Sequence, residues 1–204
     1  DLRQAAAVCI HSRLASRVLW PLAALPAADA DALHAGVAQL DWASILREGA
    51  TLAVGFDGTS RALRHTGFAA QRVKDAVVDV LRAARGNRPD VDVRRPDFRL
   101  QAVLHRERVT LYLDLAGTAL HRRGWRDDGG DAPVKENLAA GLLLRAGWRA
   151  GEPDWLVDPL CGSGTLLVEG ALMAAGIAPG VLRERFGFEA FAAAPEGLRA
   201  DLEA

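Results

Sequence analysis

The stretch LVDPLCGSGTLLVE, residues 156–169, sets two glycines between two apolar runs. Gly162 and Gly164 allow positive φ angles and a close approach of another group to the backbone. The apolar run that starts at Thr165 predicts a helix, whose first N–H groups have no partner within the helix and whose dipole is positive at that end. The run before the glycines predicts a buried strand. These residues therefore predict a strand, a tight turn and a helix, with an anionic or polar ligand at the turn.

Two common nucleotide-binding motifs are absent from this turn. A dinucleotide fingerprint would need a third glycine at position 167, where the chain has Leu167, and this disfavours a nucleotide-dependent oxidoreductase. A phosphate-binding P-loop would need Gly-Lys-Ser/Thr after four spacer residues, which the chain lacks. A nucleoside without a pyrophosphate remains. S-adenosylmethionine fits that description, because its amino-acid end can meet the turn while its ribose meets an acid on a neighbouring strand. A Gly-x-Gly turn alone is a weak signal, and its place between strand and helix strengthens it.

The periodicity of the rest of the chain predicts an α/β protein. Phe98 to Leu115 alternates apolar and polar residues on both sides of Arg106-Glu107, which predicts an antiparallel hairpin with one buried face. Pro21 favours an edge position for an extended stretch over 18–25. The other predicted elements are helices over 2–14, from Asp29, over 68–84 and from Pro133 to Gly147, and strands over 51–56 and 155–157, the last buried on both faces.

The net charge of −1 hides a cationic middle. Residues 61–126 hold 15 Lys and Arg against 7 Asp and Glu, whereas the rest of the chain holds 10 against 19. Such a segment is typical of a nucleic-acid surface, because guanidinium groups match phosphate geometry. A coding bias toward arginine and alanine would explain the arginines equally well, although it would not concentrate the charge in one segment. Both explanations stay open.

The length of 204 residues allows one large or two small domains with buried cores. No apolar run approaches the roughly 20 residues that a membrane helix needs, so we expect a soluble protein with no membrane partner. Cys9 and Cys161 form neither a disulfide framework nor a metal-ligand spacing, so we expect a reducing, cytoplasmic compartment and no metal. The chain starts at Asp1 inside a predicted helix, with neither Met nor a signal peptide, and we expect it to be a piece of a longer protein.

Residues 158–169, DPLCGSGTLLVE, closely resemble the cofactor motif of THUMP-domain class I RNA methyltransferases. Three upstream segments are similar to those that precede this motif in bacterial large-subunit (23S) rRNA guanine-N2 methyltransferases: LDLAG at 113–117, HRRGWR at 121–126 and APVKENLA at 132–139. RVKDAVVD at 72–79 resembles their THUMP helix, and SRLASR at 12–17 and RFGF at 185–188 also resemble runs in that family. The resemblance spans nearly the whole chain.

The resemblance implies a THUMP region over residues 1–116, with a truncated amino-terminal lobe and helices packed on a small mixed sheet with a hairpin. The first part of a Rossmann-like class I methyltransferase domain is implied over residues 117–204. S-adenosyl-L-methionine is the implied cofactor, guanine N2 the implied target, and 23S rRNA or a large-subunit assembly intermediate the implied partner. The implied cofactor contacts are Asp158, Pro159, Cys161, Gly162, Ser163, Gly164, Thr165 and Lys135. The implied RNA contacts are Arg61, Arg64, His65, Arg72 and Lys74.

Two features of that family are missing from these residues. The nine prolines include no adjacent pair, so an Asn-Pro-Pro-Tyr type catalytic loop is absent, and no acid at a strand end suits the ribose. The resemblance implies that both lie beyond residue 204 and that this chain alone is catalytically inactive. Cys161 has no neighbouring base and is expected to pack rather than to act as a nucleophile. Two alternatives stay open: an RNA-binding THUMP module without methyltransferase activity, and a guanine-N2 methyltransferase that acts on tRNA.

Overall fold

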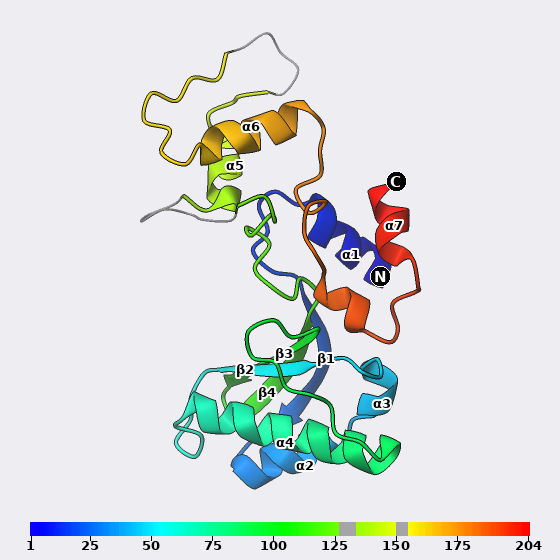
Figure 1. The fold of residues 1–204 in the computed structure, drawn as a ribbon. Helices are drawn as coiled ribbons and strands as arrows, with labels where there is room; N and C mark the ends of the chain where they lie inside the picture. Colours follow the sequence, from blue (N-terminus) through cyan, green and yellow to red (C-terminus); the bar gives the residue numbers. More distant parts are fainter. Residues whose placement is uncertain (127–133, 150–154) are drawn as a thin grey trace. The chain divides into compact units, whose positions relative to one another are not determined.

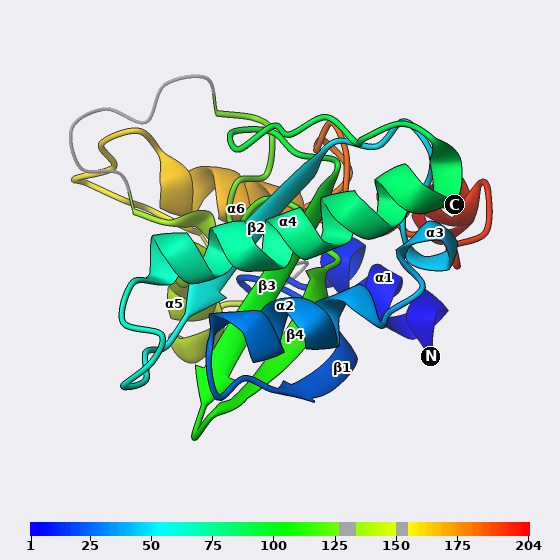
Figure 2. The same ribbon diagram turned by 90° about the horizontal axis from the view of Figure 1, so that it is seen from below.

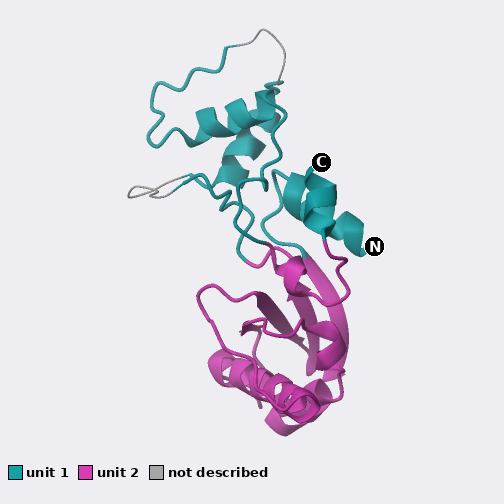
Figure 3. Ribbon diagram, turned by 45° about the vertical axis from the view of Figure 1, so that its right-hand side comes forward, with its two compact units in different colours: residues 1–18, 118–185, 197–204 teal, residues 19–117, 186–196 magenta. Residues whose placement is uncertain are grey.

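The structure is a computed structural model, which describes residues 1–126, 134–149 and 155–204. It divides the chain into two compact units (Figure 3). The helical unit comprises residues 1–18, 118–185 and 197–204, and the sheet unit comprises residues 19–117 and 186–196. The domain boundary predicted after residue 116 stays a prediction. In the compact units, residues 1–18 group with the chain that follows residue 117, and residues 186–196 group with the chain that precedes it.

A mixed sheet of four strands, in the order β1-β4-β3-β2, forms the centre of the sheet unit (Figure 1). Strand β4 is antiparallel to both β1 and β3, whereas β2 runs parallel to β3. The predicted hairpin is confirmed as β3 and β4, which turn at Arg106 and Glu107 with φ angles of 47° and 60°. The strands are β1 (Leu19–Pro26), β2 (Leu52–Asp57), β3 (Phe98–His105) and β4 (Arg108–Asp114).

Strand β1 lies at the edge of the sheet, as Pro21 predicted. Proline has no N–H to donate to a neighbouring strand, and so it is tolerated at edges and bulges. Pro21 stands opposite Tyr112 of β4, and the register of the pairing shifts between Pro21 and Ala23. The irregularity at the proline therefore disturbs one ladder of the sheet rather than two.

Helices α2 (Ala30–Ala38) and α4 (Thr66–Arg85) cover one face of the sheet, as Figure 2 shows. The helix predicted from Asp29 is confirmed as α2, with Asp29 as its N-cap: Asp29 Oδ1 accepts hydrogen bonds from the N–H groups of Asp31 and Ala32 at 3.0 and 2.8 Å. The predicted helix over 68–84 is confirmed as α4, whose residues at helical intervals are buried against the sheet. This core contains Val73, Val77, Leu81, Phe98, Leu100, Leu111 and Leu113. The short helix α3 (Trp42–Ile45) precedes β2.

Residues 186–196 return to the sheet unit after the helical segments. The 3-10 turn η1 (Gly187–Ala190) lies beside the end of β4, where the Phe188 N–H donates to the Leu115 carbonyl at 3.0 Å. A side chain at position 187 would collide with the backbone, since its Cβ would stand 2.1 Å from the Asp114 oxygen. The sheet unit is thus completed by a segment from far along the chain.

In the described part of the helical unit the regular structure consists of α1 (Leu2–His11), α5 (Glu136–Arg145), α6 (Thr165–Ala174) and α7 (Leu198–Glu203). The predicted helix over 2–14 is confirmed but is shorter, because Ser12 is already extended with φ −75° and ψ 119°. Helix α5 confirms the predicted helix that Gly147 closes, while its predicted start at Pro133 lies outside the described residues. Helix α6 confirms the helix predicted from Thr165.

The predicted strand over 155–157 is wrong. Residues 155–158 have no regular structure, and Trp155 and Val157 are 92% and 75% exposed rather than buried on both faces. A strand forms only against a hydrogen-bonded neighbour. The described residues of the helical unit include no strand that could pair with this segment. The apolar run alone therefore does not make this segment a strand. The predicted α/β class and the mixed sheet with its hairpin are confirmed.

Candidate functional site

The glycine turn before α6 has the backbone that the sequence predicted. Gly162 and Gly164 adopt φ angles of 53° and 73°, a region in which other residues are strained. The Gly164 N–H closes the turn by donating to the Cys161 carbonyl at 2.7 Å. Gly164 is the N-cap of α6 and makes no side-chain cap, so the backbone itself starts the helix. The turn therefore delivers the chain directly into the first residue of α6.

The surface of this turn is open. A Cβ built on Gly162 or on Gly164 would meet no atom within 4 Å. The neighbouring residues Pro159, Cys161 and Ser163 are exposed. The first N–H groups of a helix have no partner within it, and the dipole favours negative charge there. The turn and the start of α6 together fit an anionic or polar group that approaches the backbone closely.

Three more of the predicted cofactor contacts, at positions 135, 158 and 165, differ in their surroundings. Asp158 Oδ1 accepts a hydrogen bond from the Leu160 N–H at 3.1 Å, so this carboxylate has a local role in shaping the turn. Thr165 is buried, and its hydroxyl oxygen lies 3.3 Å from that of Ser163. Lys135 is exposed at the N-cap of α5. The structure thus brings Ser163 and Thr165 together at the turn, and the cofactor contacts themselves stay a prediction.

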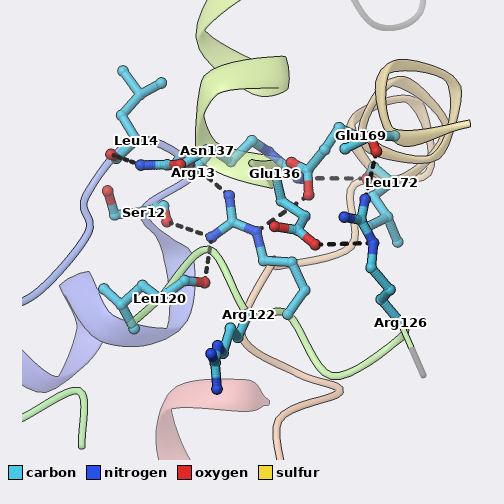
Figure 4. A network of polar contacts seen from close by, with 12 residues as sticks. Ser12, Arg13, Leu14, Leu120, Arg122, Arg126, Glu136, Asn137, Glu169 and Leu172 are labelled. Atoms are coloured by element: carbon cyan, nitrogen blue, oxygen red, sulfur yellow. Dashed lines mark hydrogen bonds and ion pairs between the residues drawn. The ribbon is translucent and has the colours of Figure 1, made fainter. Parts of the chain in front are cut away.

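An arginine that sequence reasoning did not assign to the turn reaches it from the preceding connection. The guanidinium of Arg126 donates a hydrogen bond to the Thr165 hydroxyl. Its Nε lies 3.4 Å from Oε1 of Glu136, and this ion pair is almost fully buried, with side chains 14% and 6% exposed (Figure 4). Glu136 is the first residue of α5. Arg126 therefore links the start of α5 to the start of α6.

A second buried ion pair ties α6 to the connection before α5. Glu169 Oε1 accepts from Arg123 Nε at 3.2 Å, and Glu169 and Arg123 are 0% and 2% exposed. Oε2 of the same carboxylate lies 3.9 Å from the guanidinium of Arg13 (Figure 4). Burial lowers the pKa of Arg13, Glu169 opposes that effect, and the nearby Arg123 adds to it. A single acid in the apolar run TLLVEGALMA was the sequence signal for such a pair.

The predicted RNA contacts fall into two groups in the sheet unit. Arg61, Arg64 and His65 are exposed in the loop that joins β2 to α4, where Arg64 Nε donates to the Arg61 carbonyl at 3.1 Å. The structure therefore brings these three residues together on one loop. We call this loop, residues 58–65, the β2–α4 loop.

The remaining two contacts lie on α4 itself and are engaged with carboxylates. Arg72 Nη2 lies 2.8 Å from Oδ1 of Asp31, and Lys74 Nζ lies 2.9 Å from Oδ1 of Asp75. Two residues apart on a helix are turned by about 200° from each other, so they do not share a face. The structure does not bring Arg72 and Lys74 together.

The described residues contain neither a cluster of metal ligands nor a helix that could span a membrane. Within 1–126, 134–149 and 155–204, no group of three or more His, Cys, Asp or Glu residues is arranged to hold a metal ion. No helix in these ranges has the length and apolar character needed to cross a membrane. Cys9 is buried and Cys161 is exposed.

Two protein families match the chain, one in each part of the sequence. Residues 27–114 match the THUMP domain, and residues 123–204 match UPF0020, the RMKL-like methyltransferase domain. The chain combines a THUMP domain with a UPF0020 methyltransferase domain. The resemblance to THUMP-domain methyltransferases is thereby confirmed. The THUMP match falls within the sheet unit and the methyltransferase match mostly within the helical unit.

Curated relatives are identical to this chain at about half of the aligned residues. The chain is 53% identical over 190 residues to ribosomal RNA large subunit methyltransferase K/L of Saccharophagus degradans, covering 92% of the chain and 25% of that protein. It is also 53% identical over 196 residues to the protein of the same name from Chromohalobacter salexigens, covering 94% and 26%. The chain thus spans about a quarter of the length of these relatives.

Solved structures resemble all or most of the chain. A predicted N6-adenine-specific DNA methylase from Listeria monocytogenes has a TM-score of 0.81 and 31% identity, and it covers 100% of this chain and 53% of its own. SMU.472, solved in complex with SAH, has a TM-score of 0.80 and 29% identity, with the same coverage. TrmN from Thermus thermophilus has a TM-score of 0.60 and 25% identity, and covers 79% of this chain and 47% of its own.

Proposed function

We propose that these residues belong to an S-adenosyl-L-methionine-dependent RNA methyltransferase that methylates guanine N2 in 23S rRNA. The observation that carries the proposal is the open glycine turn at 162–164, which leads into the N-terminus of α6. The methyltransferase family match over 123–204 and the SAH complex of SMU.472 support the same cofactor class. The names of the curated relatives support rRNA of the large subunit as the substrate.

The residues of the turn fit the amino-acid end of the cofactor. Gly162 and Gly164 have positive φ angles and no side chain to cover the backbone. The first N–H groups of α6 have no partner within the helix. Ser163 and Thr165 add hydroxyl groups, while Asp158 shapes the loop from within. When bound, the cofactor supplies a methyl group made electrophilic by the sulfonium to which it is attached. The role of these residues is to bind and orient that group.

Positioning is the main contribution that the proposed reaction needs. The exocyclic amine of guanine is a weak nucleophile because its lone pair is delocalised into the ring. Its edge is occupied in a paired helix, so the base must be extruded to reach the pocket. We assign no catalytic residue among these 204 residues, which hold no Asn-Pro-Pro-Tyr-like run. We therefore expect a polypeptide of these residues alone not to transfer the methyl group.

RNA binding is proposed for the sheet unit, in line with a THUMP region up to about residue 116. The β2–α4 loop offers Arg61 and Arg64 to phosphates, and His65 stands beside them at the start of α4. Guanidinium groups match phosphate geometry, and their contacts release counterions. Arg72 and Lys74 would first have to leave Asp31 and Asp75. The β2–α4 loop is therefore the primary RNA contact in this proposal.

Titration of the full-length polypeptide with S-adenosylhomocysteine tests the cofactor site. We expect saturable heat in isothermal titration, and no heat at millimolar ligand would refute the proposal. Gly164→Ala should abolish binding, because it strains and covers the turn. Gly176→Ala is the matched control: it has a φ of 67°, equal open space, and lies at the other end of α6. Both variants carry similar backbone strain, so a binding loss confined to Gly164→Ala identifies the turn.

Nucleoside analysis of the product tests the substrate. Full-length protein, S-adenosyl-L-methionine and 23S rRNA should give N2-methylguanosine by mass spectrometry. N6-methyladenosine in DNA would instead favour the activity named for the Listeria relative. Methylation of tRNA but not of 23S rRNA would favour the tRNA alternative. RNA binding without cofactor binding would favour an RNA-binding module.

A further inference from the structure

Arg126 places a positive charge beside the positive end of a helix. Its guanidinium donates to the hydroxyl of Thr165, the first residue of α6. The macrodipole of a helix favours anions at this end and disfavours cations. Side chains that accept hydrogen bonds, such as Ser, Thr, Asp and Asn, are the usual choices at a helix start. A guanidinium in this position therefore needs a compensating interaction.

Glu136 supplies that compensation. Its Oε1 lies 3.4 Å from Arg126 Nε, and the carboxylate side chain is 6% exposed. A buried ion pair stabilises a fold little, because the desolvation of both charges offsets their attraction. Apolar side chains of similar volume would stabilise the start of α6 as well or better. The pair is thus poorly explained by stability alone.

The contacts that Arg126 makes with the described residues do not involve Nη1. A guanidinium has five N–H donors in a plane. Of the two contacts described, Nε forms an ion pair with Glu136 without a hydrogen bond, and Nη2 donates to Thr165. Among the described residues, Nη1 has no hydrogen-bond partner, and Nη2 has a second N–H. The Nη1 and Nη2 end of a guanidinium can bind a carboxylate through two parallel hydrogen bonds. Since Thr165 directly follows Gly164, this fork is anchored at the glycine turn.

We propose that Arg126 binds the carboxylate of the cofactor's methionine moiety and that Glu136 positions it for this contact. This inference rests on the proposed function, because it assigns one group of the same cofactor to one side chain. The methionine moiety carries a carboxylate at neutral pH. The N-terminus of α6 and the guanidinium both favour an anion, so their mutual repulsion in the free protein becomes joint attraction in the complex.

The neighbouring arginines do not offer the same contact. Arg123 donates to Glu169, to the Leu120 carbonyl at 3.0 Å and to the Arg13 carbonyl at 2.6 Å, and it is 2% exposed. Each nitrogen of its guanidinium therefore already has a partner inside the helical unit. Arg122 is exposed and, among the contacts within the described residues, makes none to the glycine turn. Arg126 is the member of the HRRGWR segment that reaches Thr165.

Two ligands that differ in the amino-acid tail, which carries the carboxylate, test the proposal in the full-length polypeptide. S-adenosylhomocysteine carries the amino-acid tail, and 5′-methylthioadenosine keeps the adenosine and the sulfur but lacks the tail. Arg126→Gln should weaken S-adenosylhomocysteine binding by about 10-fold to 100-fold, the range for a hydrogen-bonded charge. It should change 5′-methylthioadenosine binding by less than about threefold. Arg122→Gln, an exposed arginine in the same segment, should change neither.

The ratio of the two affinities is the decisive quantity, because misfolded protein lowers both equally. Arg126→Lys keeps the charge without the planar fork, and its ratio should lie between those of the unchanged protein and of Arg126→Gln. Equal losses for both ligands, or an unchanged ratio in both variants, overturn the inference and leave the proposed function intact. If the unchanged protein binds neither ligand, the proposed function and this inference fail together.

Discussion

Replacing Glu169 by Gln tests whether the buried ion pair holds the helical unit together. The carboxylate of Glu169 is 0% exposed, lies 3.2 Å from Arg123 Nε, and has Arg13 Nη1 at 3.9 Å on its other side. Glutamine keeps the shape of the side chain and removes its charge. The substitution therefore leaves two guanidinium groups at the site without their counter-charge.

The expected cost is about 3 kcal/mol. Removing one partner of a buried pair destabilises by about 3–5 kcal/mol, because it leaves an uncompensated buried charge. Arg123 keeps its hydrogen bonds to the carbonyls of Leu120 and Arg13, so we expect the lower end of that range. Glu169 also opposes the effect of burial on the pKa of Arg13, and that opposition is lost in the variant.

Hydrogen exchange of the full-length polypeptide, read peptide by peptide, measures this cost locally. A loss of about 3 kcal/mol corresponds to about 100-fold faster exchange in α6. Exchange in α4, which belongs to the sheet unit, should not change. The matched control is Glu203→Gln on α7, whose partner Arg199 lies 2.7 Å away with side chains 22% and 25% exposed. Such a surface pair contributes about 0.5 kcal/mol or less. Acceleration below about fivefold in α6, or equal effects of both variants, would refute the reasoning.

Three further predictions concern a histidine, the RNA surface and the hairpin. Burial lowers the pKa of His121, so the folded state binds this proton less readily than the unfolded state, and stability should fall as the pH drops below about 6.5. Thermal melts at pH 7.5 and 5.5 should show a smaller decrease for His121→Gln than for the unchanged protein, and equal decreases would contradict the assignment. Arg61→Ala combined with Arg64→Ala should weaken RNA binding and reduce the slope of log affinity against log salt by roughly 1.4–1.8, whereas an unchanged slope would remove the β2–α4 loop from the interface. Because both turn residues have positive φ, Arg106→Asn with Glu107→Gly should stabilise the protein by about 1 kcal/mol, and a lower urea midpoint would contradict this.

The features that sequence predicted correctly are those decided by neighbours in the chain. The alternation over Phe98–Leu115 fixes which face of the hairpin is buried, and the structure shows that alternation in β3 and β4. Asp29 caps α2 through the N–H groups two and three residues further on. Gly162 and Gly164 turn the chain through their own backbone conformation. Each of these depends on contacts within a few residues, which periodicity and residue type describe.

The features that sequence missed depend on contacts far along the chain. Trp155–Val157 is apolar like a buried strand, but an apolar run does not specify the neighbour that pairs with it. Glu169 and Arg123 are 46 residues apart, and nothing in the spacing of either residue names the other. The return of residues 186–196 to the sheet unit is equally non-local. Composition indicated that charges were present without showing which of them meet.

The cationic middle of the sequence gains a different meaning from these pairings. Two arginines of that segment, Arg123 and Arg126, are neutralised inside the helical unit by Glu169 and Glu136. Two of the predicted RNA contacts on α4 are likewise held by carboxylates. If the predicted RNA contacts all acted on phosphates, their four permanent charges would contribute a salt slope of about 3.6, whereas the β2–α4 loop alone would contribute about 1.8. Because each pair on α4 must break before it meets a phosphate, we expect the smaller value. The charge excess counted along the sequence thus overstates the charge that this surface offers to RNA.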